Sequence, residues 1–491
     1  MAKQEVGNIA LRGSLIVGGA QVLRVMAMLV STILVARLLS PDDYGVVSMT
    51  APITALLVLL QKFGVTDAAV QAPSLSNKQT NSLMWFNILV ATFIALVLLA
   101  LSPLAGLFYN DSRVAYYSAA SASVIFISGF SLLQMALLTR ELRFKEIASI
   151  ELFAALVNVG VSIAFAYVFR NYWAIFAGQI SSVITVTLLS WTFCRWRPDR
   201  RFSLGGIRNI VTFGGTLTGF QLLNYLSRHM DSVLIGKVWG ATQLGLYNVS
   251  YKLMLFPLNN INYPLSRVML PLLATIRDDD DRYRHVFLFA LRGVVLLTVP
   301  GLVTAAVLSE KLLPWLLGDQ WSAVSPLFFW LVLAGLSQPI SNVVGWLFIS
   351  RRRGVELVKF GVLQAVTLMV AFGVGVVFGA KGVAIAYFVA MAVLSPCYWA
   401  WGARGTPVQF SDILKVLLPI VVSLVFSAMV IYSFKDRAPF ILTFFCSIIF
   451  AYVISIVSVL LCRDGRINAY QFLALLKAQF PSGRWRSRSG A

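Results

Sequence analysis

Apolar segments long enough to cross a lipid bilayer follow one another along almost the whole chain. A helix of about 20 apolar residues spans a hydrocarbon core of about 30 Å. Read in this way, the sequence predicts about fourteen transmembrane helices. We place them at 13–36, 44–61, 82–107, 114–138, 148–169, 173–194, 209–236, 244–272, 286–308, 323–349, 355–378, 382–402, 414–433 and 440–462.

The composition excludes a water-soluble fold. Hydrophobic residues make up 58% of the 491 residues and charged residues only 12%, whereas soluble domains are typically about 45–50% apolar and about 25% charged. The first apolar run ends without a small-residue cleavage site, so we expect it to stay in the mature protein. The four cysteines show no CxxC spacing, and we expect neither a disulfide framework nor a cofactor. The predicted fold is an all-α integral membrane protein.

The basic excess has a topological explanation. The chain carries 40 Lys and Arg against 20 Asp and Glu, a formal net charge of +20. If both termini are cytoplasmic, most of the basic residues fall in inside loops and tails, as the positive-inside rule requires. We therefore expect no nucleic-acid partner. The tail at 463–491 mixes apolar and basic residues, which predicts an amphipathic segment on anionic membrane lipids.

The first and seventh predicted helices align without gaps when residue n is paired with residue n+200. Identical pairs include Gly19 with Gly219, Gln21 with Gln221, and Gly45 with Gly245. Each helix is followed by a short polar turn on the outside, at 40–45 and 240–245. A weaker match aligns Trp173-Ala174 with Val383-Ala384. These matches predict two parallel six-helix bundles facing a central cavity, at 1–202 and 203–405, followed by two additional helices at 406–462 and the tail.

Polar residues share one face on three of the predicted helices. Gln221, Asn224, Arg228 and Asp231 stand at i, i+3, i+7 and i+10, which places them on one side of a helix. The first helix carries Gln21 and Arg24 on the corresponding face, and the eighth carries Lys252, Asn259 and Arg267 within about 100°. Ionisable residues at membrane depth usually face a cavity or one another.

These faces are cationic on balance, which favours an anion such as a phosphate or pyrophosphate. The predicted substrate-binding residues are Gln21, Arg24, Gln221, Asn224, Arg228, Lys252, Asn259 and Arg267. Alternatives stay open: Arg228 and Asp231 can neutralise each other, Arg267 can reach the lipid headgroups, and Asn259 can bond to another helix. Arg24 has no carboxylate within four residues and is the strongest candidate, and Asp231 is the candidate for ion coupling.

The residues at 36–45 (ARLLSPDDYG), at 231–236 (DSVLIG) leading to 244–247 (LGLY), and at 382–386 (GVAIA) resemble the polysaccharide-transporter, or Wzx-type flippase, branch of the multidrug/oligosaccharidyl-lipid/polysaccharide exporter superfamily. The resemblance covers nearly the whole chain, and is greatest to exporters of exopolysaccharides such as colanic acid or succinoglycan. It implies a bacterial inner-membrane protein that flips oligosaccharides linked to undecaprenyl pyrophosphate. It also implies proton or sodium coupling and, as partners, a polysaccharide polymerase and export machinery.

Two other functions are compatible with a membrane chain of this length. A cation-coupled multidrug exporter on the same fold is the first, but a pocket for cationic drugs should be acidic and aromatic rather than basic. A membrane polymerase or ligase acting on lipid-linked sugars is the second. No paired carboxylates, Ser/His/Asp set or HExxH motif stands at a plausible site, so we do not expect an enzyme.

Overall fold

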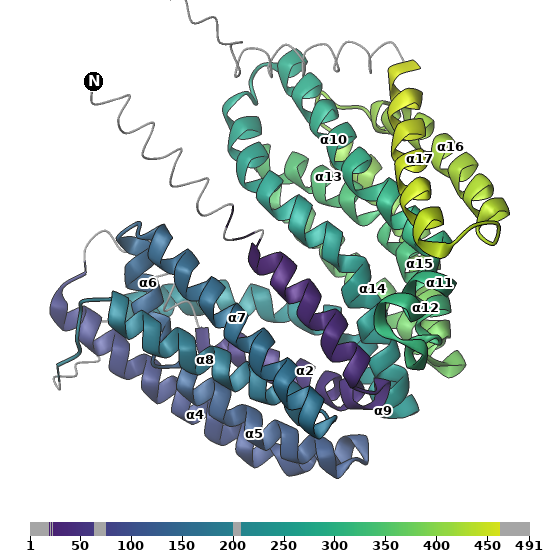
Figure 1. Ribbon diagram of the computed structural model, residues 1–491. Coiled ribbons are helices and arrows are strands. Elements are labelled where there is room, and N and C mark those ends of the chain that lie inside the picture. Colours follow the sequence, from purple (N-terminus) through teal and green to yellow (C-terminus); the bar gives the residue numbers. More distant parts are fainter. Residues whose placement is uncertain (1–18, 20, 22, 63–74, 200–207, 462–491) are drawn as a thin grey trace, which may run out of the picture. The chain divides into compact units, whose positions relative to one another are not determined.

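The computed structural model describes residues 19, 21, 23–62, 75–199 and 208–461, without the side chains of 62, 208–224, 226–228 and 263. Within these ranges every regular element is a helix (Figure 1), which confirms the predicted all-α fold. The predicted tail at 463–491 lies outside the described residues.

The helices follow the predicted spans closely. Residues 23–38 are helical. The following elements are α2 (Pro41–Lys62), α4 (Asn77–Tyr109), α5 (Ser112–Ser128), α6 (Leu132–Arg140), α7 (Phe144–Phe169), α8 (Trp173–Phe193), α9 (Arg208–Thr275), α10 (Asp280–Val307), α11 (Ser309–Leu317), η2 (Asp319–Trp321), α12 (Val324–Gly335), α13 (Gln338–Ser350), α14 (Gly354–Gly375), η3 (Val376–Phe378), α15 (Gly379–Ala403), α16 (Phe410–Phe434) and α17 (Phe440–Leu461).

Ten helical segments of the described part are long and apolar enough to cross a membrane. One of them, Gly354–Ala403, contains two predicted spans, which are separated by η3 and by Gly379 at φ 80°. The long helix α9 also contains two, because Gly240 at φ 78° and ψ −173° interrupts it. Glycine adopts these backbone angles without the steric cost that a Cβ brings. The chain is therefore a multi-pass membrane protein, as predicted.

The chain divides into two compact units. The first contains Met1–Tyr251, Leu313–Leu327 and Leu363–Tyr387, and the second contains Lys252–Leu312, Phe328–Val362 and Phe388–Ala491. Both units draw on chain segments that are distant in sequence.

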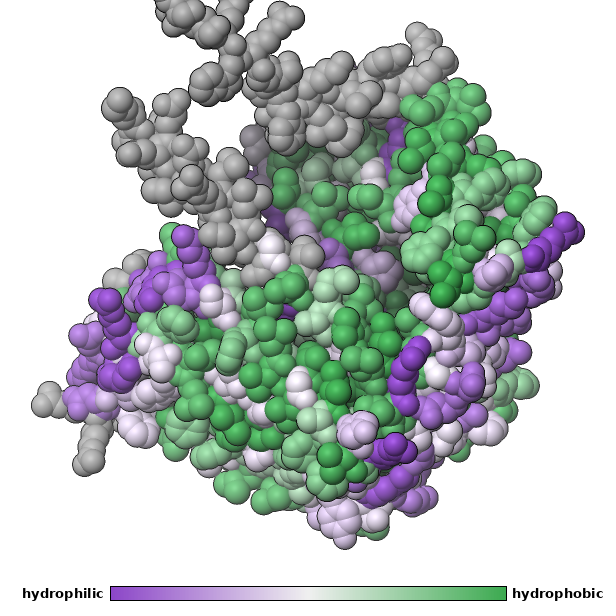
Figure 2. All heavy atoms as spheres, in the orientation of Figure 1, coloured by the Kyte–Doolittle hydropathy of each residue, from purple (hydrophilic) through white to green (hydrophobic). Residues whose placement is uncertain are grey.

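In the first unit, α4, α5, α7 and α8 pack side by side (Figure 1). A Cβ on Gly178 of α8 would lie 1.8 Å from Ser162 Oγ and 2.9 Å from the backbone oxygen of Asn158, both on α7, so a larger residue would force these helices to shift. Leu89, Phe93 and Leu96 of α4 stand at i, i+4 and i+7, and all three are exposed. Figure 2 shows apolar residues over the visible middle of this bundle and hydrophilic ones toward its ends. An exposed apolar face of this size is a surface for lipid.

In the second unit, α17 places small side chains inward and large ones outward. Thr443, Ser447, Ala451 and Ser455 are buried at intervals of four residues. Phe445 and Ile449 are about 60% exposed. Ser423 of α16 donates to Ser455 Oγ at 3.3 Å. Small residues at the contact and large apolar residues outside are the pattern of helices that pack within lipid.

The turns before α7 and α14 have the same construction, 210 residues apart. Leu142 and Arg352 both have positive φ, at 55° and 59°. The next residue in each case, Arg143 or Arg353, pairs with the glutamate three positions on. Arg143 also donates to Phe193 O at the end of α8, and Arg353 donates to Gly402 O at the end of α15. The spacing equals that of the weak match between residues 173–174 and 383–384.

Candidate functional site

Arg24 lies in the first described helix and forms an ion pair with Glu151 of α7. Their side chains are 31% and 40% exposed. We expected Arg24 to carry an unpaired charge because no carboxylate stands within four residues of it. The structure corrects this point, since the partner comes from 127 positions away. Gln21, on the turn before, is exposed.

Asp231 is a buried carboxylate with partners of its own. Only 4% of the residue is exposed. The Tyr247 hydroxyl donates to Asp231 Oδ2 at 2.8 Å, and the Ser232 backbone N–H donates to Oδ1 at 2.6 Å. The Ser232 hydroxyl then donates to Asn248 Oδ1 at 3.2 Å. Both carboxylate oxygens thus accept hydrogen bonds, which offsets much of the cost of removing the group from water.

An aromatic row continues from this carboxylate within the first unit. Tyr247 stacks on Tyr251 with ring centroids 6.1 Å apart, and Tyr251 meets Tyr387 at 6.4 Å. Tyr387 in turn contacts Phe372 at 5.9 Å. The buried acid therefore lies at one end of a row of aromatic rings from α9, α15 and α14. Sequence spacing identified Asp231. Its hydrogen bond from Tyr247 was not predicted, because the two residues lie on opposite sides of the helix break at Gly240.

The other predicted residues of the seventh span are Gln221, Asn224 and Arg228. They lie in α9, but their side chains are outside the described set, so mutual neutralisation of Arg228 and Asp231 stays a prediction. Tyr225 of the same helix donates to Pro52 O at 2.9 Å. The His229 ring packs against the Tyr225 ring at an interplanar angle of 33°, with ring centroids 4.3 Å apart.

Lys252, Asn259 and Arg267 belong to the second unit and are exposed residues of α9. All three lie on one helix, as the predicted face requires. The neighbouring Asn260 amide donates to Phe256 O at 2.7 Å, one turn earlier in the same helix. This bond pairs the Asn260 amide N–H group within its own helix. Their substrate-binding role stays a prediction.

The turn after the first helix is tighter than predicted, because α2 already begins at Pro41. Ser40 and Asp43 form a reciprocal cap: the Asp43 N–H donates to Ser40 Oγ at 3.2 Å, and the Ser40 N–H donates to Asp43 Oδ2 at 3.1 Å. This is a capping box with Asp in place of Glu, followed by proline at the first helical position. The Tyr172 N–H also donates to Asp43, at 3.0 Å.

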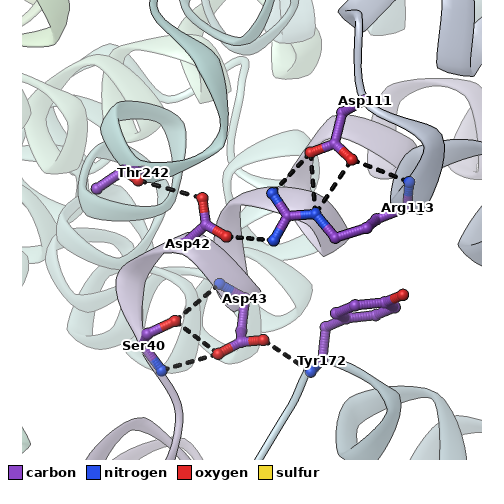
Figure 3. A network of polar contacts seen from close by, with 7 residues as sticks. All are labelled: Ser40, Asp42, Asp43, Asp111, Arg113, Tyr172 and Thr242. Carbon is purple, nitrogen blue, oxygen red and sulfur yellow. Dashed lines mark hydrogen bonds and ion pairs between the residues drawn. The ribbon is translucent and has the colours of Figure 1, made fainter.

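Arg113 joins the turn at 40–43 to the turn at 110–113, and Asp42 joins it to Thr242 (Figure 3). Arg113 pairs with Asp111 at 2.7 Å and with Asp42. Asp42 also accepts a hydrogen bond from the Thr242 hydroxyl at 3.2 Å. Burial raises the pKa of Asp111, but the hydrogen bonds from Arg113 outweigh burial and hold this pKa below its usual range. The sequence analysis did not identify this network, because Asp42 and Arg113 are 71 residues apart.

The chain is similar to proteins of polysaccharide biosynthesis. Residues 34–326 match the family described as polysaccharide biosynthesis protein. The lipopolysaccharide biosynthesis protein WzxC of Escherichia coli (strain K12) is 26% identical over 368 residues, covering 74% of this chain and 75% of WzxC. The succinoglycan biosynthesis transport protein ExoT of Rhizobium meliloti (strain 1021) is 21% identical over 370 residues, covering 75% of this chain and 74% of ExoT.

Solved structures identify the fold. The lipid II flippase MurJ in its inward closed conformation matches with a TM-score of 0.73 at 13% identity, covering 94% of this chain and 100% of that one. An inward-facing multidrug resistance transporter of the MATE family, in the MOP superfamily, matches with a TM-score of 0.59 at 13% identity, covering 80% and 96%. At these identities the likeness establishes the fold alone. Because the family match spans more than half of its residues, this chain belongs to the polysaccharide biosynthesis protein family and has the fold of the MOP superfamily transporters.

Proposed function

We propose that the chain flips oligosaccharide units linked to undecaprenyl pyrophosphate across the bacterial inner membrane, for exopolysaccharide or lipopolysaccharide biosynthesis. The observation that carries the proposal is the family match, together with a fold like that of a lipid II flippase over 94% of the chain. Relatives named for transport in polysaccharide biosynthesis support it further. In the proposed topology both termini are cytoplasmic, and export proceeds toward the opposite leaflet.

The proposed mechanism is alternating access between two repeats, 1–202 and 203–405, with 406–462 and the tail outside them. Two observations support this division. The turns at Arg143 and Arg353 share a backbone conformation and a capping role, 210 residues apart. Contacts near Gly45 and Gly245 also join positions separated by 200. Repeats in the same orientation can rock against each other around a central site.

In this mechanism the pyrophosphate binds to the cationic residues, with Arg24 and Arg228 foremost. Glu151 is then an exchangeable counterion: it neutralises Arg24 when no substrate is bound, and a phosphate takes its place. Arginine suits this exchange because its planar group offers paired N–H donors to a carboxylate or a phosphate alike. Gln21, Gln221, Asn224, Lys252, Asn259 and Arg267 complete the proposed site for the polar headgroup. The isoprenoid tail stays in the surrounding lipid.

Asp231 is the proposed coupling residue for a proton or sodium ion. Its burial and its hydrogen bond from Tyr247 support a site whose protonation changes local packing. Once protonated, the carboxyl is neutral and no longer requires two donors, so the hydrogen bond from the Tyr247 hydroxyl can break.

A polysaccharide polymerase and export machinery are the proposed partners, because flipped units must be joined and carried onward.

Deleting the gene tests the proposal in cells. Loss of surface polymer, together with accumulation of the lipid-linked unit in the cytoplasmic leaflet, is the expected result, and the full chain should reverse both. Unchanged polymer would contradict the proposal. Loss of drug resistance with normal polymer would favour the multidrug exporter, whose fold is also similar.

A further inference from the structure

Two of the helical spans are interrupted in the same way. In the first unit, α5 and α6 are separated by a turn that ends at Ser131, whose hydroxyl donates to Ser128 O at 3.0 Å. In the second unit, α12 and α13 (Figure 1) are separated by a turn that ends at Ser337, whose hydroxyl donates to Ala334 O at 3.0 Å. Both serines have right-handed helical φ and ψ. We call these turns the Ser131 break and the Ser337 break.

The Ser131 break is held by buried side chains from three neighbouring helices, α2, α4 and α8. Each side chain donates to a backbone carbonyl in the turn or just before it. The donors and acceptors are Gln61 and Ile125 O at 3.0 Å, Asn87 and Gly129 O at 2.6 Å, and Trp191 and Phe130 O at 2.9 Å. Gln61 and Asn87 are each only 1% exposed. Because lipid offers no donors to an interrupted helix, these bonds fix the break in place.

Asn262 is the counterpart of Gln61 in the proposed second repeat. It stands 201 positions later in the sequence, and only 4% of it is exposed. Neither Nδ2 nor Oδ1 of its amide has a hydrogen-bond partner among the described residues. A buried amide without partners costs free energy that an apolar side chain of the same size does not. In this arrangement of the helices, Asn262 therefore lowers the stability of the fold.

The position of Asn262 on α9 places its amide beside the first turns of α13. One turn after it, Ser266 accepts a hydrogen bond from the Trp346 indole at 3.1 Å. Two turns before it, Met254 Sδ lies 2.4 Å from the place that a Cβ on Gly335 would take. Asn262 lies between these two contacts, both along the helix and around it, since successive residues turn by about 100°. All five residues belong to the second unit.

Two prolines withdraw backbone donors near the Ser337 break. Pro339 has no N–H for Gly335 O, and Pro396 of α15 has none for Ala392 O. Each of these carbonyls needs a donor from outside its own helix ladder. A polar side chain on a neighbouring helix can supply one, as Gln61 does at the Ser131 break.

A cavity of about 100 Å³ lies between α12 and α15 in the second unit. Apolar side chains such as Leu333, Phe388 and Met391 line most of it. Ser337 and Ser395 also line it, and the Ser395 hydroxyl, in a residue that is 3% exposed, has no partner among the described residues. Helix interiors are usually packed without voids of this size. The cavity therefore gives the helices beside the break room to move.

We propose that the Ser337 break is a hinge at which α13 changes its angle to α12 during transport, and that Asn262 donates to a carbonyl of the break in the second arrangement. The proposal rests on the proposed function. The Ser131 break shows such a bound arrangement, with Gln61 in the role that we give to Asn262. Leaving Asn262 and Ser395 without partners raises the free energy of the first arrangement toward that of the second, which suits an equilibrium between two states.

Spin labels on either side of the break test the hinge directly. They are attached at Phe329→Cys and Ile349→Cys, two exposed positions that lie about 30 Å apart along the helices. The full chain carries alanine at its four native cysteines. In nanodiscs, the distance between the labels should fall into two populations, either without ligand or after addition of undecaprenyl pyrophosphate. The control pair, Tyr116→Cys with Glu141→Cys, spans the Ser131 break and should give one population.

Substitutions at Asn262 separate a hinge from a packing defect. Asn262→Leu should leave the unfolding temperature unchanged or raise it, because it removes two unpartnered polar atoms. It should also reduce one of the two populations about tenfold, the effect of losing one buried hydrogen bond, and export should fall with it. Asn262→Gln keeps the amide and should restore both in part. Gln61→Leu, the matched control, should lower the unfolding temperature, because Gln61 holds the Ser131 break.

Substitutions at Ser395 test the cavity independently. Ser395→Leu fills the cavity and should also suppress one population. Ser395→Ala removes only the unpartnered hydroxyl and should keep both populations. If either Asn262→Leu or Ser395→Leu fails to reach the membrane, the other decides.

The outcomes separate the hinge from the function. A single distance with and without undecaprenyl pyrophosphate would overturn the hinge, as would two populations that Asn262→Leu and Ser395→Leu leave unchanged. Undiminished export by a variant that has lost one population would also overturn it. Two populations that these variants suppress, in a strain whose polymer does not depend on the gene at all, would support the hinge and reject the proposed function.

Discussion

The ion pair between Arg24 and Glu151 allows two roles of the arginine to be separated. One role is binding of a substrate phosphate, and the other is neutralisation of a carboxylate within the membrane. Three variants distinguish them: Arg24→Gln, Glu151→Gln, and the double variant with both changes. Glutamine has nearly the shape of glutamate without its charge; in place of arginine it is shorter and removes the guanidinium donors together with the charge.

The size of the effect follows from burial. A charge at the centre of a membrane helix costs about 2.5–3.5 kcal/mol on insertion scales. The Arg24 and Glu151 side chains are 31% and 40% exposed, so an unpaired partner should cost less, about 1–2 kcal/mol. Loss of charge-assisted bonds to a phosphate should weaken substrate binding by about 1.5–3 kcal/mol, roughly 10- to 150-fold.

The assay measures polymer output per molecule of protein in the membrane. If Arg24 binds substrate, Arg24→Gln and the double variant should both lose export, whereas Glu151→Gln should keep it. If Arg24 only neutralises Glu151, each single variant should lower protein abundance and the double variant should restore it. Full export by the double variant would refute the substrate-binding role.

Three other predictions follow from the described contacts. Asp231→Asn should abolish the response of transport to an imposed proton or sodium gradient. Tyr247→Phe should keep this response but change its pH dependence. An unchanged response in Asp231→Asn would exclude Asp231 as the coupling residue. The lowered pKa of Asp111 means that its contact with Arg113 stabilises the fold fully above the unfolded carboxyl's pKa of about 4, and that this stabilisation is lost as pH falls through the lower folded value. The difference in unfolding temperature between the unaltered chain and Asp111→Asn should therefore be constant from about pH 7 to 5, and a decline within that range would count against this contact. Arg353→Ala should lower thermal stability by about 1.5–3 kcal/mol, because the end of α15 loses a charged cap, and an unchanged unfolding temperature would show that the cap contributes nothing.

The sequence predicted the helices well because the signal for each is local. A run of about 20 apolar residues has few alternatives in lipid, and even α9 was resolved into two spans by its glycine and polar residues at 240–245. The turn at Ser40 was predicted too long. Its polar residues are the cap of a helix that begins at once, and a polar run alone does not distinguish a cap from a loop.

The candidate site was predictable only as far as one helix face. Periodicity placed Asp231 on a polar face, but its partner Tyr247 lies beyond the Gly240 interruption. The partners of Arg24 and Arg37 are 127 and about 280 positions away, and no spacing rule reaches so far. The match at a shift of 200 was visible in the sequence, but its physical reason was not. A Cβ on Gly45 would collide with the backbone of Ala241, and a Cβ on Gly245 with the backbone of Pro41. Only the folded backbone reveals these contacts.

Transport by the reconstituted protein is the sharpest test of the proposed flipping. The full chain is placed in proteoliposomes with a fluorescent oligosaccharide linked to undecaprenyl pyrophosphate, and the fraction accessible from each leaflet is followed over time. Movement between the leaflets should depend on the protein and should be lost in Arg24→Gln. A rate equal to that of protein-free liposomes, with the protein folded and correctly inserted, would refute the proposed function.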